Sequence, residues 1–177
     1  MSFKTTPDQI YLQECFTYNP FTGFLTWKER PQNHFNSRKG HGMWNARYPG
    51  RVAGSVSHKG YLRVVVDASD YPAHRIIWKL MHNEDPEQVD HIYGDRWDNR
   101  ISMLRKATYN ENAQNRKTSV LSTTQLKGVS PRPNGTFRAR IGTNPRVSLG
   151  SFSTAEAAHQ AYCSAAESLY GSFARAA

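Results

Sequence analysis

The sequence predicts an α+β protein built from two small domains. A chain of 177 residues has room for two compact domains at most. Segments with alternating apolar residues, typical of strands, are interspersed with segments in which apolar residues recur every three or four positions, typical of helices. A polar, Ser/Thr-rich stretch at 117–124 predicts a linker. We therefore place one domain at 1–117, a linker at 118–125 and a second domain at 126–177.

Charge and composition point to a polyanion as the partner. The chain carries 23 Lys and Arg against 14 Asp and Glu, a formal net charge of +9, and nucleic acid is the commonest polyanion for such a protein. Aromatic residues make up 12% of the chain, which excludes a disordered basic tail. Because no long apolar run and no apolar signal core are present, we expect an intracellular protein without a membrane partner. The wide separation of Cys15 and Cys163 argues against structural zinc and a disulfide framework.

Five patterns precede residue 88. Thr6 is expected to cap a helix that runs to about Phe16, with Gln9 at the capping-box position. A second helix is expected where Ile76, Ile77, Leu80 and Met81 fall on one face. This second helix is predicted at 73–82. The sequence also predicts strands at 24–27 and 60–66 and an irregular stretch at 29–51.

The segment 88–116 combines an ordered set of elements with polar side chains. It predicts a strand at 88–92, a loop, a strand at 101–107 and a helix that opens with a capping box of Thr108 and Glu111. Hydrolysis of a phosphodiester needs a base that activates water and oxygen ligands for a hard cation. Histidine is the usual base near neutral pH, and a carboxylate with an amide oxygen suits Mg²⁺. The segment offers all three, in His91, Asp90 and Asn112.

The runs AHRIIW, VDHIYGD, DNRISMLR and ATYNENAQN resemble the HNH (ββα-metal) endonucleases, in particular the phage-type homing endonucleases. The resemblance covers roughly residues 10–117, since TGFLTWK and GYLRVVV are also similar to what precedes the motif in that family. It implies that His91 is the general base, that Asp90 and Asn112 hold Mg²⁺, for which Mn²⁺ could substitute, and that the products carry 5′-phosphate and 3′-hydroxyl ends. The implied partner is double-stranded DNA inside a bacterial host cell.

One position departs from the family's sequence pattern. Where the family has an asparagine before Leu-Arg, this chain has Met103. In the family that asparagine pins the loop and orients the base, and methionine cannot form such a hydrogen bond. Either Asn99 or Asp98 then takes over the orienting role, or the site is weakened. His74 is a further candidate neighbour of the base, although a buried structural role is more common for such a histidine.

Basic residues around the motif are candidate phosphate contacts, with a solvated basic face as the alternative for each. They are Arg75, Arg96, Arg100 and Arg105.

The second domain is expected to contain three strands and one helix. Strands are predicted at 127–132, 136–142 and 146–150, with a tight turn at Asn134-Gly135. In the second strand apolar and basic residues alternate, so that one face is apolar and the other carries arginine. A helix is expected to follow a capping box formed by Ser153 and Glu156.

This segment is similar to the plant APETALA/ethylene-response-factor DNA-binding domain, through the runs KGVS, FRARI, SLGSF, AAHQAY and YGSFA. Such a domain is a small three-stranded antiparallel sheet packed on one helix, and it is also found appended to phage HNH endonucleases. The resemblance implies a sheet face that enters the major groove. The DNA-facing residues would be Lys127, Ser130, Arg132, Arg138, Arg140 and Arg146.

Together these observations predict a site-specific DNA endonuclease of the homing type that nicks as a monomer or cuts both strands as a homodimer. No protein partner is implied. Two alternatives stay open. The first is a non-catalytic DNA-binding regulator with a decayed HNH core, which Met103 favours. The second is an RNA- or nucleoprotein-binding module, which competition between duplex DNA and RNA would distinguish.

Overall fold

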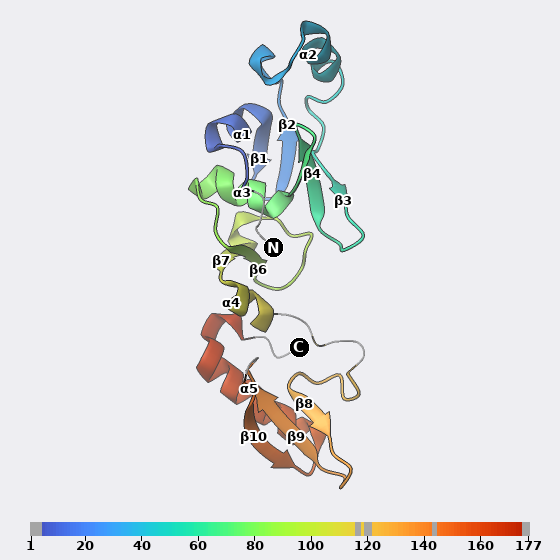
Figure 1. The fold of residues 1–177 in the computed structure, drawn as a ribbon, viewed down its shortest axis with the longest axis vertical. Coiled ribbons are helices and arrows are strands. Elements are labelled where there is room, and N and C mark those ends of the chain that lie inside the picture. The colour runs from blue at the N-terminus through green and yellow to red at the C-terminus, as the bar shows by residue number, and fades with distance from the viewer. Residues whose placement is uncertain (1–4, 116–117, 119–121, 143–144, 175–177) are drawn as a thin grey trace. The chain divides into compact units, whose positions relative to one another are not determined.

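The chain divides into two compact units in a computed structural model that describes residues 5–115, 118, 122–142 and 145–174 (Figure 1). Unit 1 is Met1–Ala107 and unit 2 is Thr108–Ala177. Residues 119–121 of the predicted linker lie outside the described residues. Within the described ranges, no helix has both the length and the apolar character needed to cross a bilayer.

Unit 1 consists of short helices and antiparallel strands around one hydrophobic core. Its described sheets are the pair β1–β2, the three-stranded β3–β4–β5 and the pair β6–β7. The core forms where α3 packs on β4, β5 and α1, and Leu25, Ile76 and Val64 are among its fully buried side chains. The elements are α1 (Gln9–Cys15), β1 (Phe16–Asn19), β2 (Phe24–Trp27), η1 (Gln32–His34), α2 (Arg38–Asn45), β3 (Ser55–Val56), β4 (Leu62–Val66), β5 (Ser69–Pro72), α3 (Ala73–His82), β6 (Gln88–His91), η2 (Ile101–Met103) and β7 (Leu104–Ala107).

The prediction for the first helix is wrong at its cap. Helix α1 begins at Gln9, and the Thr6 hydroxyl does not cap it but donates to Asp85 Oδ1 at 2.6 Å. The Gln9 amide likewise leaves the helix end and donates to the Leu80 carbonyl at 2.7 Å. Both side chains therefore tie the start of the chain to α3 and the loop after it, and a local capping motif is replaced by tertiary contacts.

The expectation that 29–51 is irregular is also wrong, because η1 and α2 lie within it. The Ser37 hydroxyl caps α2 by accepting from Gly40 N at 3.0 Å. Two glycines lower the intrinsic helix propensity of this eight-residue segment. Packing of Trp44 against Trp27, with ring centroids 5.0 Å apart, stabilises the helix instead.

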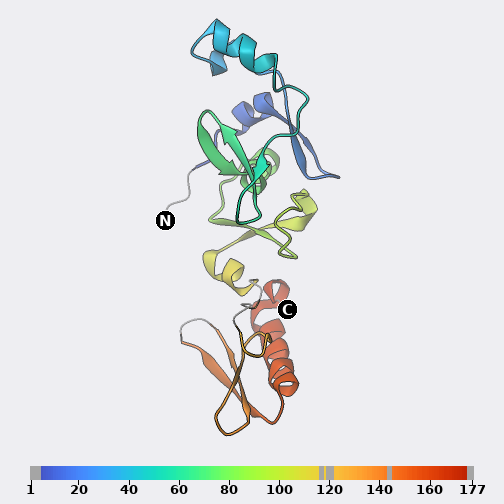
Figure 2. The ribbon, with the colours of Figure 1, turned by 90° about the vertical axis from the view of Figure 1, so that its right-hand side faces the viewer.

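Unit 2 is a three-stranded antiparallel sheet with one long helix on one face, as predicted. The strand order is β10–β9–β8, and α5 lies along one face of this sheet (Figure 2). The buried residues of α5 are Ala158, Tyr162 and Ala166. The predicted cap is one residue off, since Thr154 rather than Ser153 caps α5 and accepts from Ala157 N at 3.1 Å. The elements are α4 (Tyr109–Gln114), β8 (Val129–Pro131), β9 (Phe137–Ile141), β10 (Val147–Phe152), α5 (Ala155–Tyr170) and η3 (Gly171–Phe173).

Candidate active site

The β6–β7 hairpin carries the predicted catalytic residues. The two strands are antiparallel, with Asp90 opposite Arg105 and His91 opposite Leu104. Successive strand residues point to opposite faces, so Asp90 and His91 leave the hairpin on different sides. His91 is the last residue of β6, where the chain turns into the loop 92–100. Both side chains are buried, which isolates them from bulk water.

His91 is held by an asparagine from the following loop. Its Nε2 lies 3.2 Å from Asn99 Oδ1, and Asn99 is only 2% exposed. The Asn99 Nδ2 donates to the Trp97 carbonyl at 3.2 Å, which fixes the orientation of the amide. The amide oxygen therefore faces the imidazole and accepts from Nε2–H. In the neutral ring this leaves the lone pair on Nδ1, which is the atom that can accept a proton.

The surroundings of His91 keep its imidazole neutral near pH 7. Burial lowers the pKa of His91 below its ordinary value of 6.5, and this effect outweighs the Asn99 hydrogen bond and the nearby carboxylates of Asp90, Asp95 and Asp98, which raise it. A general base must be unprotonated to act. The balance of these effects thus gives His91 the protonation state that a base requires.

His74 and Tyr61 complete the surroundings of this imidazole. His74 lies in the first turn of α3, and its ring meets that of His91 edge-on with centroids 4.9 Å apart. The Tyr61 ring is 5.6 Å from His74 and 6.0 Å from His91. Burial, followed by the charge of His91, holds the pKa of His74 well below 6.5. His74 is therefore a neutral neighbour of His91.

Asp90, the predicted metal ligand, is paired with Arg105 across the hairpin. Arg105 donates from Nε to Asp90 Oδ2 at 2.9 Å and also approaches with Nη2 at 2.8 Å. Two close nitrogens on one oxygen give a charge-assisted contact stronger than a neutral hydrogen bond. This geometry gives Arg105, predicted as a phosphate contact, a carboxylate partner on its own hairpin.

Three other predicted residues near the motif, Asp98, Arg75 and Arg96, have different surroundings in the structure. Asp98 does not contact His91, because its carboxylate pairs with Arg100 at 2.5 Å, and this contact lowers the pKa of Asp98. Arg75 is 7% exposed and donates to the carbonyls of Pro86 and Glu87 at 2.9 and 3.4 Å. That position orders the chain before β6 and does not fit the predicted phosphate contact. Arg96 is exposed and stacks over Tyr61 at 4.7 Å, which leaves it on the surface beside the base.

Two residues of the β1–β2 hairpin support the loop that carries Asn99, and the sequence did not single them out. The Tyr18 hydroxyl accepts from Ile101 N at 2.8 Å and donates to the Asn99 carbonyl at 3.1 Å. Gly23 sits so close to the loop that an added Cβ would lie 2.6 Å from Arg100 N. Gly23 belongs to the run TGFLTWK, and Tyr18 lies outside every motif quoted above.

Among the described residues of unit 1, the predicted metal ligand is Asp90, whose carboxylate Arg105 contacts. Across residues 5–115, 118, 122–142 and 145–174, no three His, Cys, Asp or Glu side chains gather around one point. Mg²⁺ takes few protein ligands because it keeps several waters, but the Asp90 carboxylate is buried and paired with Arg105. Asn112 lies on α4 in unit 2, so its pairing with Asp90 stays a prediction of the sequence.

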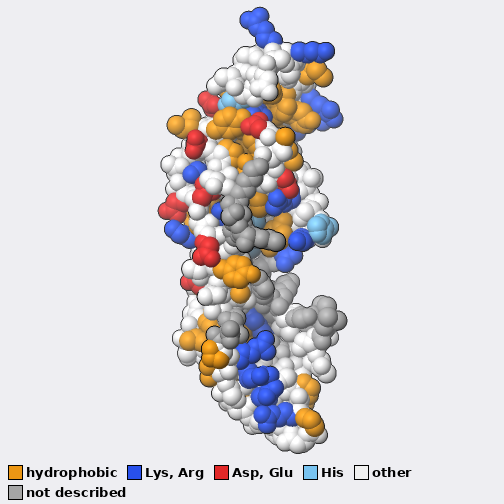
Figure 3. All heavy atoms as spheres, viewed as in Figure 1, with side chains coloured by type: hydrophobic (Ala, Val, Ile, Leu, Met, Phe, Trp, Pro, Cys, Tyr) orange, Lys and Arg blue, Asp and Glu red, His pale blue; other side chains and the backbone are white. Residues whose placement is uncertain are grey.

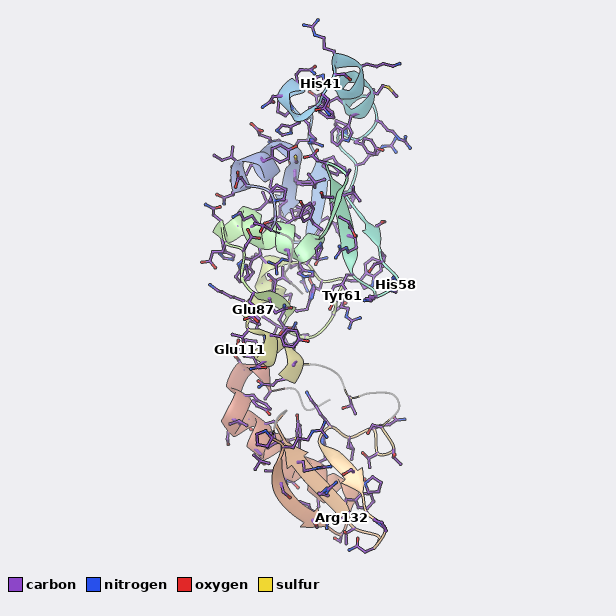
Figure 4. The ribbon with its side chains drawn as sticks, in the orientation of Figure 1. His41, His58, Tyr61, Glu87, Glu111 and Arg132 are labelled. Carbon is purple, nitrogen blue, oxygen red and sulfur yellow. The ribbon has the colours of Figure 1, made fainter. Side chains whose placement is uncertain are left out.

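The open face of the sheet in unit 2 carries three of the predicted DNA contacts, Ser130, Arg138 and Arg140. Ser130 pairs with Arg138 on β8 and β9, while Ala139 and Ile141 turn to the opposite, buried face. Lys and Arg side chains form a column along this face in Figure 3, and Arg132 lies at the β8–β9 turn in Figure 4. Burial lowers the pKa of Arg138, as do the like charges of Arg140 and Arg132. The arginines crowd together, and the Nε of Arg138 is buried without a hydrogen-bond partner among the described residues.

Comparison with known proteins is consistent with this geometry. No curated protein and no solved structure matches the chain. Residues 71–114 match the family model for HNH endonucleases, and this segment runs from β5 to the end of α4. It contains His74, Asp90, His91, Asn99 and Asn112. Residues 71–114 are therefore similar to an HNH endonuclease domain, which supports a nuclease that binds DNA.

Proposed function

We propose that the chain is a site-specific DNA endonuclease of the homing type, from a phage or mobile element and acting inside a bacterial cell. The β6–β7 hairpin cleaves and the sheet of unit 2 anchors the DNA. One observation carries the catalytic part of this proposal: His91 is buried and neutral, and its Nε2 lies 3.2 Å from the Asn99 amide oxygen. This arrangement fixes both the tautomer and the direction of the ring, which a general base needs.

In this mechanism His91 Nδ1 removes a proton from the water that attacks the scissile phosphate. The Asn99 oxygen accepts from the opposite side of the ring and holds the imidazolium that forms. The carboxylates of Asp90, Asp95 and Asp98 favour that charged form, since each raises the pKa of His91. A divalent cation, Mg²⁺ or Mn²⁺, held by Asp90 and by Asn112 as the sequence predicts, would stabilise the charge on the phosphorane and on the leaving 3′ oxygen.

The sheet of unit 2 supplies the binding half of the proposal. Arg138 and Arg140 project from β9 on the face opposite α5, where arginine can pair with guanine edges or phosphates. A hollow of about 370 Å³ adjoins this face and is lined by Lys127, Arg140 and Arg146, among others. Clustered cations at this density repel one another in the free protein, and a polyanion relieves that repulsion.

The alternative, a DNA-binding regulator, is favoured by one observation. Arg105 pairs with Asp90 in the position where a cation ligand is expected. An arginine that neutralises this carboxylate permanently would leave a folded but inactive hairpin. The two functions differ in cleavage and agree in DNA binding.

Cleavage of supercoiled plasmid tests the proposal. Wild-type protein should nick in Mg²⁺ or Mn²⁺ and stop in EDTA, whereas His91→Ala should bind DNA but not cut. His58→Ala is the matched control, because His58 is an exposed histidine of the same unit, and it should cut as wild type. Equal cleavage by His91→Ala would refute the assignment of the base. Binding without any cleavage on randomised DNA in either metal would favour the regulator.

A further inference from the structure

Helix α2 lies at the end of unit 1 away from the β6–β7 hairpin (Figures 1 and 2). Side-chain contacts anchor one of its faces. Asn45 accepts from Arg30 N at 3.0 Å and donates to the Arg30 carbonyl at 2.9 Å. His41 Nε2 lies 3.0 Å from the same carbonyl. Arg30 itself is buried against the rings of Phe35 and Trp44, at 5.0 and 5.1 Å. These contacts fix the orientation of the helix.

The opposite face of α2 and of the turn after it is exposed and basic. At 100° per residue its exposed positions cover one continuous half of the helix. Between residues 31 and 66 the chain has six Lys or Arg and no Asp or Glu, and Figure 3 shows blue side chains at this end of unit 1. We call this surface the α2 face; it consists of Arg38, Lys39, Gly42, Met43, Ala46 and Arg47.

Two features of the α2 face are unfavourable in the free protein. Arg38 and Lys39 stand in the first turn of the helix, which contains no acidic residue, although the helix dipole makes that end positive. Gly42 stands inside the helix, where glycine is less stable than alanine. A Cβ added at Gly42 would meet nothing within 4 Å, so packing within the protein gives no reason for glycine at this position. A polyanion that lies against the helix would make both features favourable. Its negative charge would offset the positive charge of the first turn, and the missing side chain at Gly42 would let it approach the backbone closely.

We propose that the α2 face is a second DNA-binding surface, which contacts the phosphate backbone of a duplex. Arg38, Lys39 and Arg47 neutralise phosphates on either side of the line formed by Gly42 and Ala46, where the missing side chains let the backbone approach. This inference rests on the proposed function for the identity of the partner. Met43 is the one large apolar side chain of the α2 face, 65% exposed, and this is too little apolar surface for insertion into a lipid bilayer.

Binding of the full chain to a random-sequence 30-base-pair duplex in EDTA tests the α2 face without cleavage. Fluorescence anisotropy at 50 to 200 mM salt gives both Kd and its salt dependence. Lys39→Gln removes one cation, and Gly42→Leu places a long side chain over the line of approach. Lys28→Gln is the matched control, because Lys28 is also an exposed lysine of unit 1, with its Nζ 2.8 Å from the Gln13 carbonyl.

Loss of one phosphate contact lowers the slope of log Kd against log salt by about 0.9. If the variant and the wild type bind equally well at 1 M salt, this difference in slope makes the binding of the variant roughly eightfold weaker than that of the wild type at 0.1 M salt. Lys39→Gln should show both effects and Lys28→Gln neither. Gly42→Leu should bind at least as weakly as Lys39→Gln while its melting temperature stays at or above that of the wild type, since leucine is the better helix former.

The outcomes separate this inference from the proposed function. Wild-type binding that neither Lys39→Gln nor Gly42→Leu changes would overturn the α2 face and leave the endonuclease proposal intact. Absence of any duplex binding by the wild type would overturn both. Equal losses in Lys39→Gln and Lys28→Gln would show a general effect of net charge and would also overturn the α2 face.

Discussion

Replacing Asn99 by alanine and by aspartate should move the acid limb of the cleavage pH profile in opposite directions. The Asn99 hydrogen bond raises the pKa of His91, while burial lowers it below 6.5. Alanine removes the acceptor, so the pKa falls further, the base stays unprotonated to lower pH and the acid limb moves down. Aspartate places a negative charge about where Oδ1 lies now, 3.2 Å from Nε2. A carboxylate this close should raise the pKa of His91 by about 1 to 3, and the acid limb moves up.

The rates above the acid limb should also separate the two variants. A general base contributes about 10² to 10⁴ in rate, and an imidazole that can rotate loses part of that. We expect Asn99→Ala to cut about 10 to 100 times more slowly on the plateau above the acid limb, a barrier increase of about 1.4 to 2.7 kcal/mol. Asn99→Asp keeps an acceptor in place, so its rate at high pH should stay closer to the wild-type rate.

Initial rates of plasmid nicking between pH 5 and 9, at fixed Mg²⁺, measure both effects. Asn36→Ala is a suitable control, because Asn36 is an exposed asparagine of the same unit, and its profile should match the wild type. A shift of the acid limb in the same direction for both Asn99 variants, or in neither, would refute the assignment of Asn99 as the partner that orients the base.

Three further predictions concern packing and pH. Burial holds the pKa of His74 well below 6.5, so as the pH falls below 6.5 this histidine takes up a proton in the unfolded chain before it does so in the folded one. The free energy of unfolding should therefore decrease below pH 6.5, by up to about 1.4 kcal/mol per pH unit. Urea unfolding of His74→Gln should show a shallower dependence of stability on pH. Gly128→Ala puts a Cβ 2.1 Å from Tyr162 Cδ2 at a positive φ, so calorimetry should show unit 2 destabilised by at least about 2 kcal/mol while unit 1 melts unchanged. Gly23→Ala should slow nicking by tenfold or more, whereas Gly50→Ala, also at positive φ but with no atom within 4 Å, should not.

The parts of the fold that the sequence predicts well are those set by local signals. Helix α3 matches the predicted bounds 73–82, because its apolar stripe is strong; Ile76 and Ile77 are buried, although Met81 at its end is exposed. The capping box of Thr108 and Glu111 is present in full. In both cases residues three or four positions apart determine the structure, and no distant partner is needed.

The parts that it does not predict depend on distant partners. Thr6 is a good local cap, yet it bonds Asp85, 79 residues further on. Helix α2 has weak propensity and exists because Trp44 and Asn45 dock on the segment around Arg30. Whether Asn99 or Asp98 contacts His91 also depends on tertiary structure. The two polar residues are adjacent in one turn, and the sequence does not say which neighbour each of them meets. In the structure Asn99 meets His91 and Asp98 meets Arg100.

The same geometry explains how the hairpin can do without an asparagine at position 103. The backbone of Met103 still pins the loop, since its N–H donates to the Arg100 carbonyl at 2.8 Å and its carbonyl accepts from Ile92 N at 2.9 Å. Tyr18 adds a second attachment through its contacts with Ile101 N and the Asn99 carbonyl. A side-chain amide at position 103 would have served to pin the loop and to orient the base. Here backbone bonds and Tyr18 hold the loop, and Asn99 is the residue that contacts His91, so we expect the two roles to be divided between them. A methionine at position 103 is therefore compatible with an oriented His91 side chain. Of the two observations that favour a decayed core, only the Asp90–Arg105 pair remains.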